Sequence, residues 1–227
     1  MKLYSGPLSL FTAKVRIALA EKGLPYERIE VGWSLARRYE PHHPDVVALN
    51  PKAQVPVLVD GALAVYDSTL IFEYLEDRYP EPPLYPRDVA GRARCRQLEA
   101  AADEILFPHV WTLIDQGFYP AGAEGRDTSR LDRDTSRLDA ARAGIARFSA
   151  ERDKELADRS WLCGEFSVAD IACIVFLNAA ATLGAPPAPE LANLRGWLER
   201  TQARPAVARE LGEMRAFVQQ LFAQTTR

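Results

Sequence analysis

The chain has 227 residues, 48% of them hydrophobic and 26% charged, with 28 Lys and Arg against 31 Asp and Glu. This is the composition of a globular protein long enough to bury a substantial core, and its slight acidity gives no support for nucleic-acid binding. No apolar run reaches the roughly 18 residues of a membrane span, and a strand-like N-terminus stands where a signal peptide would lie. We therefore expect a cytoplasmic protein with no membrane or nucleic-acid partner and with its three cysteines reduced.

The first third of the chain carries alternating strand and helix signals. The predicted elements are a strand, a helix, a strand, a short helix, the two strands of a hairpin and a closing helix, at residues 2–5, 8–22, 26–31, 45–49, 57–59, 63–66 and 68–78. Gly23 stands where a helix C-cap is expected, and Asp60-Gly61 is a two-residue hairpin turn. The opening has the length of a βαβ unit, while residues 32–43 lack periodicity and predict a loop.

Two dipeptides beside the hairpin indicate a pocket for a peptide-like ligand. Proline cannot donate a hydrogen bond to a sheet, so Pro56 marks an edge or the start of a strand. A cis bond at Val55-Pro56 would expose the backbone N–H and C=O of Val55 to a partner. Asp67-Ser68 opens a helix, whose free N–H groups and macrodipole favour a carboxylate. A simple helix cap is the alternative interpretation of Asp67-Ser68.

From about residue 88 onward the pattern is helical. Prolines at positions 80, 82, 83 and 86 cannot continue a helix, so we expect a linker there. Helices are predicted at residues 92–111, 131–157, 167–183, 191–202 and 205–222. We expect a break or kink at Pro108. Ser167 and Asp170 form a capping-box pattern before a run that is apolar on all sides, which predicts the buried centre of a helical domain.

Residues 126–132 and 133–139 repeat the same seven residues, RDTSRLD. The repeat adds about two helical turns at roughly 3.6 residues per turn, which keeps Leu131 and Leu138 near one face. We interpret it as a solvated extension between two helices. A partner contact or a pocket rim is the alternative.

Four segments carry a resemblance to a known family, at residues 1–27, 50–80, 161–177 and 194–205. In order and spacing they resemble the soluble glutathione transferases, in a bacterial-like serine-type form. The resemblance implies a thioredoxin-like α/β domain of βαβ-ββα order over residues 1–80, a linker over 81–87 and an all-helical domain over 88–227. It also implies a homodimer, in which the first domain of one subunit packs on the second domain of the other.

The resemblance implies glutathione as a co-substrate. The residues expected to bind it are Lys52, Gln54, Val55, Pro56, Asp67 and Ser68. Val55 is expected to pair its backbone with the cysteinyl unit, as in strand addition. Ser68 is expected to bind the γ-glutamyl carboxylate and Asp67 to lie near the ammonium. Gln54 and Lys52 are expected to reach the glycyl end, with a solvated loop charge as the alternative for Lys52.

Glutathione transfer needs a thiolate, and a free thiol with a pKa of about 8.5 is mostly protonated at neutral pH. Ser9 aligns with the activating serine of serine-type members, so we expect it to be catalytic through its hydroxyl at a helix N-terminus. A plain N-cap is the alternative, and Thr12 and Ser5 are secondary donors. Ser9 in place of cysteine disfavours thiol–disulfide exchange. Ser9-Leu10-Phe11 departs from the zeta-like S-S-C run, which argues against maleylacetoacetate-type isomerisation.

A small hydrophobic electrophile is expected as second substrate, in a pocket between the domains. The residues expected to line this pocket are Leu10, Phe11, Phe107, His109 and Trp111. Aromatic residues at helical spacing are more often part of a core, and a histidine such as His109 is more often a core or surface residue than a pocket residue. His42 and His43 lack a third ligand at convincing spacing, so no metal site is predicted.

The leading hypothesis is a glutathione transferase that conjugates or reduces electrophilic or peroxide substrates in detoxification. One alternative is a non-catalytic glutathione transferase-like binding or interaction module. The other is a glutathione-dependent dehalogenase, ether-cleaving enzyme or isomerase. The sequence does not select the electrophile.

Overall fold

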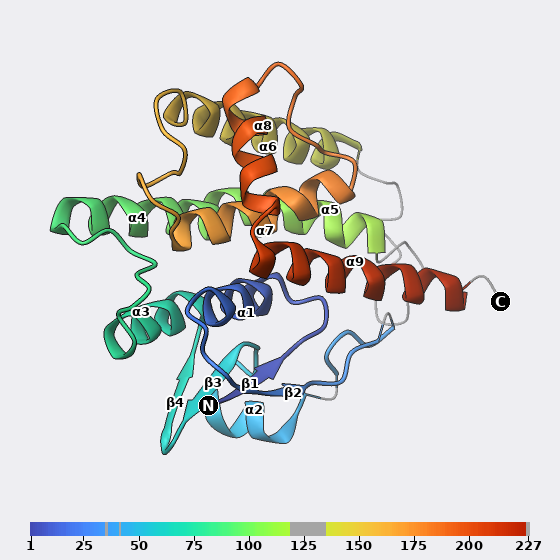
Figure 1. Cartoon of the computed structure of the whole chain (residues 1–227). Coiled ribbons are helices and arrows are strands. Elements are labelled where there is room, and N and C mark those ends of the chain that lie inside the picture. The colour runs from blue at the N-terminus through green and yellow to red at the C-terminus, as the bar shows by residue number, and fades with distance from the viewer. Residues whose placement is uncertain (35, 41, 119–134, 226–227) are drawn as a thin grey trace. The chain divides into compact units, whose positions relative to one another are not determined.

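The computed structural model describes residues 1–34, 36–40, 42–118 and 135–225. The chain forms two compact units, one of residues 1–85 with 202–227 and one of residues 86–201. The first unit contains a four-stranded sheet and the second is helical (Figure 1). The predicted fold class, a thioredoxin-like α/β domain followed by helices, is confirmed.

The sheet of the first unit is mixed. Its strands are β1 (Lys2–Ser5), β2 (Glu27–Glu30), β3 (Val57–Asp60) and β4 (Leu63–Tyr66), in the order β2-β1-β3-β4. β1 runs parallel to β2 and antiparallel to β3, and β3 pairs with β4. The hairpin was expected, but its two-residue turn is Gly61 and Ala62 and not Asp60-Gly61, because Asp60 still pairs with Leu63. Gly61 in that turn has a φ of 60°, a left-handed conformation that glycine adopts without a steric cost.

Helices cover both faces of this sheet. They are α1 (Leu10–Glu21) and α3 (Ser68–Arg78) on one face and α2 (Pro44–Leu49) on the other (Figure 1). Side chains alternate along a strand, so Tyr4 and Val57 point to one side, where they cluster with Val46 of α2. Leu3 and Leu58 point to the opposite side and are fully buried.

The C-terminal helix α9 (Pro205–Thr225) packs along α1 and is part of the first unit (Figure 1). Arg16 of α1 is 3% exposed, and its Nε donates to Glu210 Oε2 at 2.8 Å. Arg204 donates from Nη2 to Glu21 Oε2 at 2.6 Å near the other end of α1. The sequence assigned α9 to the helical half, and that domain boundary stays a prediction.

The second unit is built around one buried helix. Its elements are α4 (Val89–Ala101), a π-helical turn η1 (Ala102–Leu106), α5 (Phe107–Phe118), α6 (Thr135–Glu155), α7 (Val168–Thr182) and α8 (Ala192–Gln202). Every residue from 168 to 177 is buried, which confirms α7 as the predicted centre. No helix within the described residues is long and apolar enough to cross a membrane.

A closed polar cluster fixes the N-terminus of α7. Asp170 is fully buried and accepts hydrogen bonds from Ser167 N and Ser167 Oγ, both at 2.9 Å. It also accepts them from Leu162 N at 3.1 Å and Trp197 Nε1 at 2.7 Å. The predicted capping box is therefore present, and it extends to α8 through Trp197.

The break expected at Pro108 takes another form. Before the proline, the chain widens into η1, where Phe107 N–H donates to Ala102 O. Pro108 then stands in the first turn of α5, where a missing N–H is tolerated. A π-helical turn inside a helical run therefore replaces the break, because it absorbs the altered hydrogen bonding.

The RDTSRLD repeat falls mostly outside the described residues. The first copy, residues 126–132, lies entirely outside them, and α6 begins at Thr135 within the second copy. The interpretation of the repeat as a solvated extension stays a prediction.

Candidate functional site

The N-terminus of α3 is capped by Asp67. Its Oδ1 accepts a hydrogen bond from Thr69 N–H at 3.2 Å, and its Oδ2 accepts one from Lys52 Nζ at 3.1 Å. The capping role is therefore confirmed. The backbone of Asp67 has φ 75° and ψ 127°, a conformation that costs a non-glycine residue about 1–3 kcal/mol. A strained backbone conformation of this kind persists only where the surrounding structure holds it in place, and such conformations are concentrated at ligand-binding sites.

Ser68 follows in the first turn of α3 and is 1% exposed. Its Oγ has no hydrogen-bond partner among the described residues. A buried hydroxyl without a partner costs about 1–3 kcal/mol, so it calls for an explanation such as a bound ligand. The free N–H groups and dipole of the same helix turn favour an anion. Together these features suit a carboxylate.

The segment before β3 turns at the predicted position. The Val55-Pro56 peptide bond is cis, with Pro56 buried and Val55 half-buried. Asn50 holds the turn, because its Nδ2 donates to Gln54 O at 2.7 Å and its Oδ1 accepts from Lys52 N at 2.9 Å. Sequence reasoning missed this role of Asn50, although the Asn50-Pro51 dipeptide is a turn signal. The Lys52 and Gln54 side chains are exposed.

Ser9 is the N-cap of α1, as the alternative interpretation predicts. Its Oγ accepts a hydrogen bond from Thr12 N at 3.2 Å. A hydroxyl that accepts one hydrogen bond still has its own hydrogen to donate, so the cap leaves room for a catalytic role. Thr12 Oγ1 is buried with no partner in the described part of the chain. Ser5 is fully buried and accepts a hydrogen bond from Arg16, which directs it to the interior.

The residues expected to line the second-substrate pocket divide between the two units, with Leu10 and Phe11 in the first and Phe107, His109 and Trp111 in the second. Leu10 is 6% exposed. The Phe107 ring lies 5.2 Å from that of Phe176 on buried α7. His109 packs so closely on Gly144 that a Cβ there would lie 2.2 Å from its Nε2. These contacts favour core roles for Phe107 and His109, and the pocket stays a prediction.

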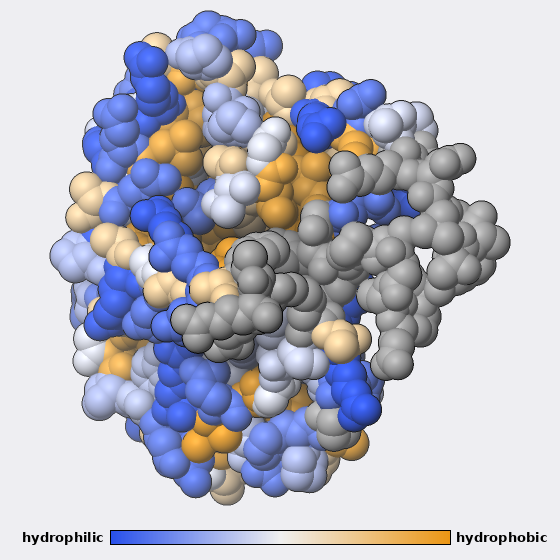
Figure 2. All heavy atoms as spheres, turned by 90° about the vertical axis from the view of Figure 1, so that its right-hand side faces the viewer, coloured by the Kyte–Doolittle hydropathy of each residue, from blue (hydrophilic) through white to orange (hydrophobic). Residues whose placement is uncertain are grey.

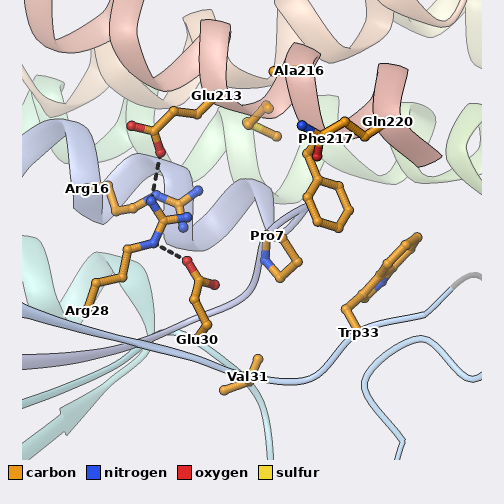
Figure 3. A pocket seen from close by; sticks show the side chains of 11 residues that line it. Pro7, Arg16, Arg28, Glu30, Val31, Trp33, Glu213, Ala216, Phe217 and Gln220 are labelled. Carbon is orange, nitrogen blue, oxygen red and sulfur yellow. Dashed lines mark hydrogen bonds and ion pairs between the residues drawn. The ribbon is translucent and has the colours of Figure 1, made fainter. Parts of the chain in front are cut away.

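A pocket of 450 Å³ lies within the first unit, between α9 and the segment that follows β2 (Figure 3). One end is aromatic, where the Trp33 and Phe217 rings meet at a centroid distance of 5.8 Å and an interplanar angle of 72°. Pro7 lies beside them. Two residues of chain span at most about 7 Å, so Pro7 brings this end close to Ser9.

The other end of the pocket is charged and internally paired. Arg28 Nη1 donates to Glu213 Oε2 at 2.7 Å, and its Nε forms an ion pair with Glu30 (Figure 3). Arg16 also lines the pocket and pairs with Glu210. Each guanidinium is therefore already neutralised by a carboxylate.

Sequence reasoning missed the aromatic end of this pocket. Trp33 lies in a stretch with no periodicity, and Phe217 lies in a helix that was assigned to the other half of the chain. One signal was available: a tryptophan in a loop has no strand or helix of its own to bury it. That signal marks Trp33 but does not identify its partner.

No group of three His, Cys, Asp or Glu residues within the described ranges is placed to hold a metal ion.

Comparison with known proteins gives the family. Residues 3–83 match the model described as glutathione S-transferase, N-terminal domain, and residues 135–200 match the model of the C-terminal domain. Glutathione S-transferase GstB of Escherichia coli is 32% identical over 197 residues, which cover 86% of this chain and 89% of that protein. The chain belongs to the glutathione S-transferase family.

Other relatives align with the chain over a shorter stretch. A stringent starvation protein A homolog of Coxiella burnetii is 40% identical over 119 residues, 52% of this chain and 53% of that protein. Glutathione S-transferase Z1 of Arabidopsis thaliana is 46% identical over 109 residues, 48% of each chain. The chain thus spans about half the length of these two curated relatives.

A solved relative carries a glutathione derivative. It is a glutathione S-transferase of Methylobacterium radiotolerans in complex with glutathione sulfonate. The two structures superpose with a TM-score of 0.72 at 31% identity, covering 92% of this chain and 93% of the other.

Proposed function

We propose that this glutathione S-transferase binds glutathione at the N-terminus of α3 and activates its thiol at the N-terminus of α1. The observation that carries the proposal is Ser68, a buried hydroxyl with no partner among the described residues, beside the strained cap residue Asp67. A bound carboxylate would accept the hydroxyl hydrogen and offset its desolvation cost. The glutathione sulfonate complex of the Methylobacterium relative supports the same ligand class.

Each part of glutathione has a matching group in this segment. The γ-glutamyl carboxylate accepts from Ser68 Oγ and its backbone N–H, while the ammonium pairs with Asp67. The backbone of Val55 bonds the cysteinyl unit in the manner of an added strand. Lys52 pairs with Asp67 in the structure, and its side chain is 57% exposed, so it can turn to the glycyl carboxylate with Gln54.

Ser9 acts on the sulfur. Lowering a thiol pKa by about two units requires roughly 2.7 kcal/mol of differential stabilisation of the thiolate. A hydroxyl hydrogen bond and the positive end of α1 both favour the anion. The thiolate then attacks an electrophilic carbon, or the oxygen of a peroxide, as expected of a cytoplasmic detoxification enzyme.

The pocket of Figure 3 suits an uncharged aromatic electrophile. Its volume of 450 Å³ is within the usual range for small-molecule sites. Trp33 and Phe217 offer ring contacts. Arg28 is already paired with Glu30 and Glu213, so the pocket offers an ionic ligand no net opposite charge. A neutral ligand therefore has the smaller desolvation cost when it enters the pocket.

Calorimetric titration of glutathione into the full-length protein tests the proposal. We expect saturable binding in the micromolar-to-millimolar range, weakened about tenfold or more by Ser68→Ala, which corresponds to about 1.4 kcal/mol. Ser149→Ala is the matched control, because Ser149 Oγ is another buried hydroxyl without a described partner, on α6 of the other unit. Equal affinities of the two variants, or no binding by the wild type, contradict the proposal.

We also propose a homodimer. The first unit exposes Leu63 and Leu70 at 49% and 54%, and the second unit exposes Val89 and Ile105 at 85% and 59%. Apolar side chains on both units support a pairing in which the first unit of one subunit covers the second unit of the other. Leu70→Glu is expected to lower the sedimentation coefficient to that of a monomer. A wild type that is monomeric at micromolar concentration refutes the dimer.

A second candidate is a binding module of the same fold without catalysis. It is supported by the 40% identity to a stringent starvation protein A homolog, a relative whose name denotes no transfer reaction. The 46% identity to glutathione S-transferase Z1 supports a third, isomerase-type activity, against which the Ser9-Leu10-Phe11 sequence stands. Glutathione binding without turnover of any aromatic electrophile, peroxide or ring-opening substrate favours the binding module.

A further inference from the structure

Residues Gly6 to Ser9 form the turn that joins β1 to α1. The Ser9 N–H donates a hydrogen bond to Gly6 O at 3.3 Å. Pro7, whose ring fixes φ, occupies the second position of the turn, where proline is favoured. Ser9 is half-buried, and its Oγ accepts a hydrogen bond from Thr12 N–H at 3.2 Å. The place of the Ser9 hydroxyl therefore depends on how this turn is held.

Arg16 of α1 holds the turn through the carbonyl group that closes it. Its Nη1 donates to Gly6 O at 3.4 Å, and also to the hydroxyl of Ser5, the last residue of β1. Gly6 O thus accepts hydrogen bonds from both Ser9 N–H and Arg16 Nη1. The same oxygen atom therefore links the guanidinium to the backbone of Ser9.

The C-terminal helix α9 fixes the guanidinium. Glu210 accepts hydrogen bonds from Arg16 Nε at 2.8 Å and from Arg16 Nη2, which makes the pair bidentate. Both side chains are almost fully buried, with exposed fractions of 3% and 5%. A planar guanidinium that is paired in this way keeps one orientation. Its third nitrogen, Nη1, is therefore held toward the turn before α1.

We propose that Arg16 and Glu210 are positioning residues for Ser9, through which the C-terminal helix acts on the glutathione thiolate. This role rests on the proposed hydrogen bond from Ser9 to the thiolate. A donor stabilises a charge effectively only from a fixed place, and a misplacement of about 1 Å can lower a rate by about a hundredfold. The contacts from Glu210 through Arg16 and Gly6 O to Ser9 N–H supply that fixed place.

A second ion pair joins the same two helices far from the turn. Arg204 donates from Nε at 3.0 Å and from Nη2 at 2.6 Å to Glu21, at the C-terminal end of α1. About 18 Å of helix separate Glu21 from Ser9 at 1.5 Å per residue. The Arg204–Glu21 pair can therefore hold α9 on α1 but cannot position Ser9. The two ion pairs allow the docking of α9 and the positioning of Ser9 to be tested separately.

Paired apolar replacements in the full-length protein test the proposal. Arg16→Met with Glu210→Leu removes the donor to Gly6 O and keeps apolar volume between the helices, an exchange that is often neutral for stability. The thiol of bound glutathione is titrated by the ultraviolet absorbance of its thiolate. We expect its pKa to rise by about one pH unit, toward the value with Ser9→Ala. Glutathione affinity, measured where the thiol is protonated, is expected to stay within about twofold of the wild type.

Two further variants complete the set. Arg204→Met with Glu21→Leu is the matched control, which removes the other ion pair and is expected to leave the thiol pKa at the wild-type value. Arg16→Lys keeps the buried ion pair with Glu210 and tests the proposal even if the double replacement does not fold. One ammonium group cannot occupy the positions of both Nη1 and Nη2, so Arg16→Lys is also expected to raise the thiol pKa.

Amide hydrogen exchange, measured without glutathione, separates the positioning of Ser9 from its action on the thiol. The Thr12 N–H donates to Ser9 Oγ, so its exchange reports the place of the hydroxyl. We expect exchange at Thr12 to be faster by about fivefold or more in the Arg16 variants and unchanged in the control.

Each outcome of these measurements supports or overturns a defined part of the proposal. Arg16 variants with wild-type exchange at Thr12 or a wild-type thiol pKa overturn the positioning role, as does an equal change in the control. A thiol pKa that Ser9→Ala leaves unchanged contradicts the proposed activation of glutathione, and the effect of Arg16 and Glu210 on the thiolate is then overturned with it.

Discussion

The N-termini of α3 and α7 use the same two residue types, a serine and an aspartate, in opposite ways. At α7, the Asp170 carboxylate accepts hydrogen bonds from the Ser167 backbone, the Ser167 hydroxyl, Leu162 and Trp197. At α3, the buried Ser68 hydroxyl has no partner in the described part of the chain. A buried polar cluster that satisfies itself supports the fold, whereas one that is left incomplete at a helix N-terminus is a candidate for ligand binding.

The backbone conformations at the two helix N-termini differ in the same sense. Ser167 has φ −145° and ψ 176°, which is relaxed extended chain. Asp67 has φ 75°, which few non-glycine residues adopt. The strained cap therefore coincides with the incomplete cluster. This coincidence favours binding over stability as the role of the α3 terminus.

The largest expected effect is on stability, from Asp170→Ala. It leaves several buried donors without an acceptor, so we expect the free energy of unfolding to fall by about 3–5 kcal/mol. Urea denaturation followed by circular dichroism measures it. Asp139→Ala is the control, because the Asp139 side chain is 74% exposed and its removal is expected to change stability by less than about 0.5 kcal/mol. If the two variants change the free energy of unfolding by the same amount, the polar cluster at α7 does not have the structural role assigned to it.

Ser9→Ala is expected to affect the rate. Loss of the hydroxyl donor should lower kcat by about tenfold or more, or at least about 1.4 kcal/mol in the activation barrier, with glutathione still bound. The variant also loses an N-cap, at about 1 kcal/mol of stability. Ser9→Thr keeps both functions and is expected to retain most of the rate. A kcat for Ser9→Ala equal to that of the wild type excludes Ser9 from the mechanism.

Asp67→Asn has the smallest expected effect. It distinguishes the contribution of the Asp67 charge from the role of Asp67 as a helix cap. Asparagine tolerates a positive φ and keeps an oxygen acceptor for Thr69 N, so the free energy of unfolding should change by less than about 0.5 kcal/mol. Loss of the carboxylate removes its attraction for the glutathione ammonium. We expect a few-fold loss of affinity by calorimetry, because a partly exposed ion pair contributes up to about 1 kcal/mol. Unchanged affinity would show that Asp67 is a cap alone.

The sequence predicted best those elements whose signals are local. Residues 68–78 were expected as a helix and are α3, because the cap at Asp67 and the helical pattern adjoin. The same holds for the capping box of α7 and for the β3–β4 hairpin, although the turn of the hairpin lies one residue later than expected, at Gly61 and Ala62. The packing of α9 on α1 was not predictable, because Arg16 and Glu210 lie 194 residues apart and no periodicity identifies a helix's partner.

The features of the candidate site also differ in how far the sequence predicts them. The Asp67-Ser68 dipeptide could be found from its sequence, but the missing partner of the Ser68 hydroxyl depends on the packing around it. Phe107 was chosen as a pocket residue by its aromatic type alone, and its contact with the Phe176 ring could not be predicted in that way. The pocket of Figure 3 joins Trp33 and Phe217 from distant parts of the chain, a proximity that only the fold creates.

The ion pair between Arg16 and Glu210 has a consequence for synthesis on the ribosome. The second unit, residues 86–201, is continuous in the chain and can fold as it emerges. The first unit must wait, because burying the Arg16 guanidinium without its carboxylate partner costs several kcal/mol until Glu210 has been made. The part of the chain that is translated first is therefore the part that folds to completion last.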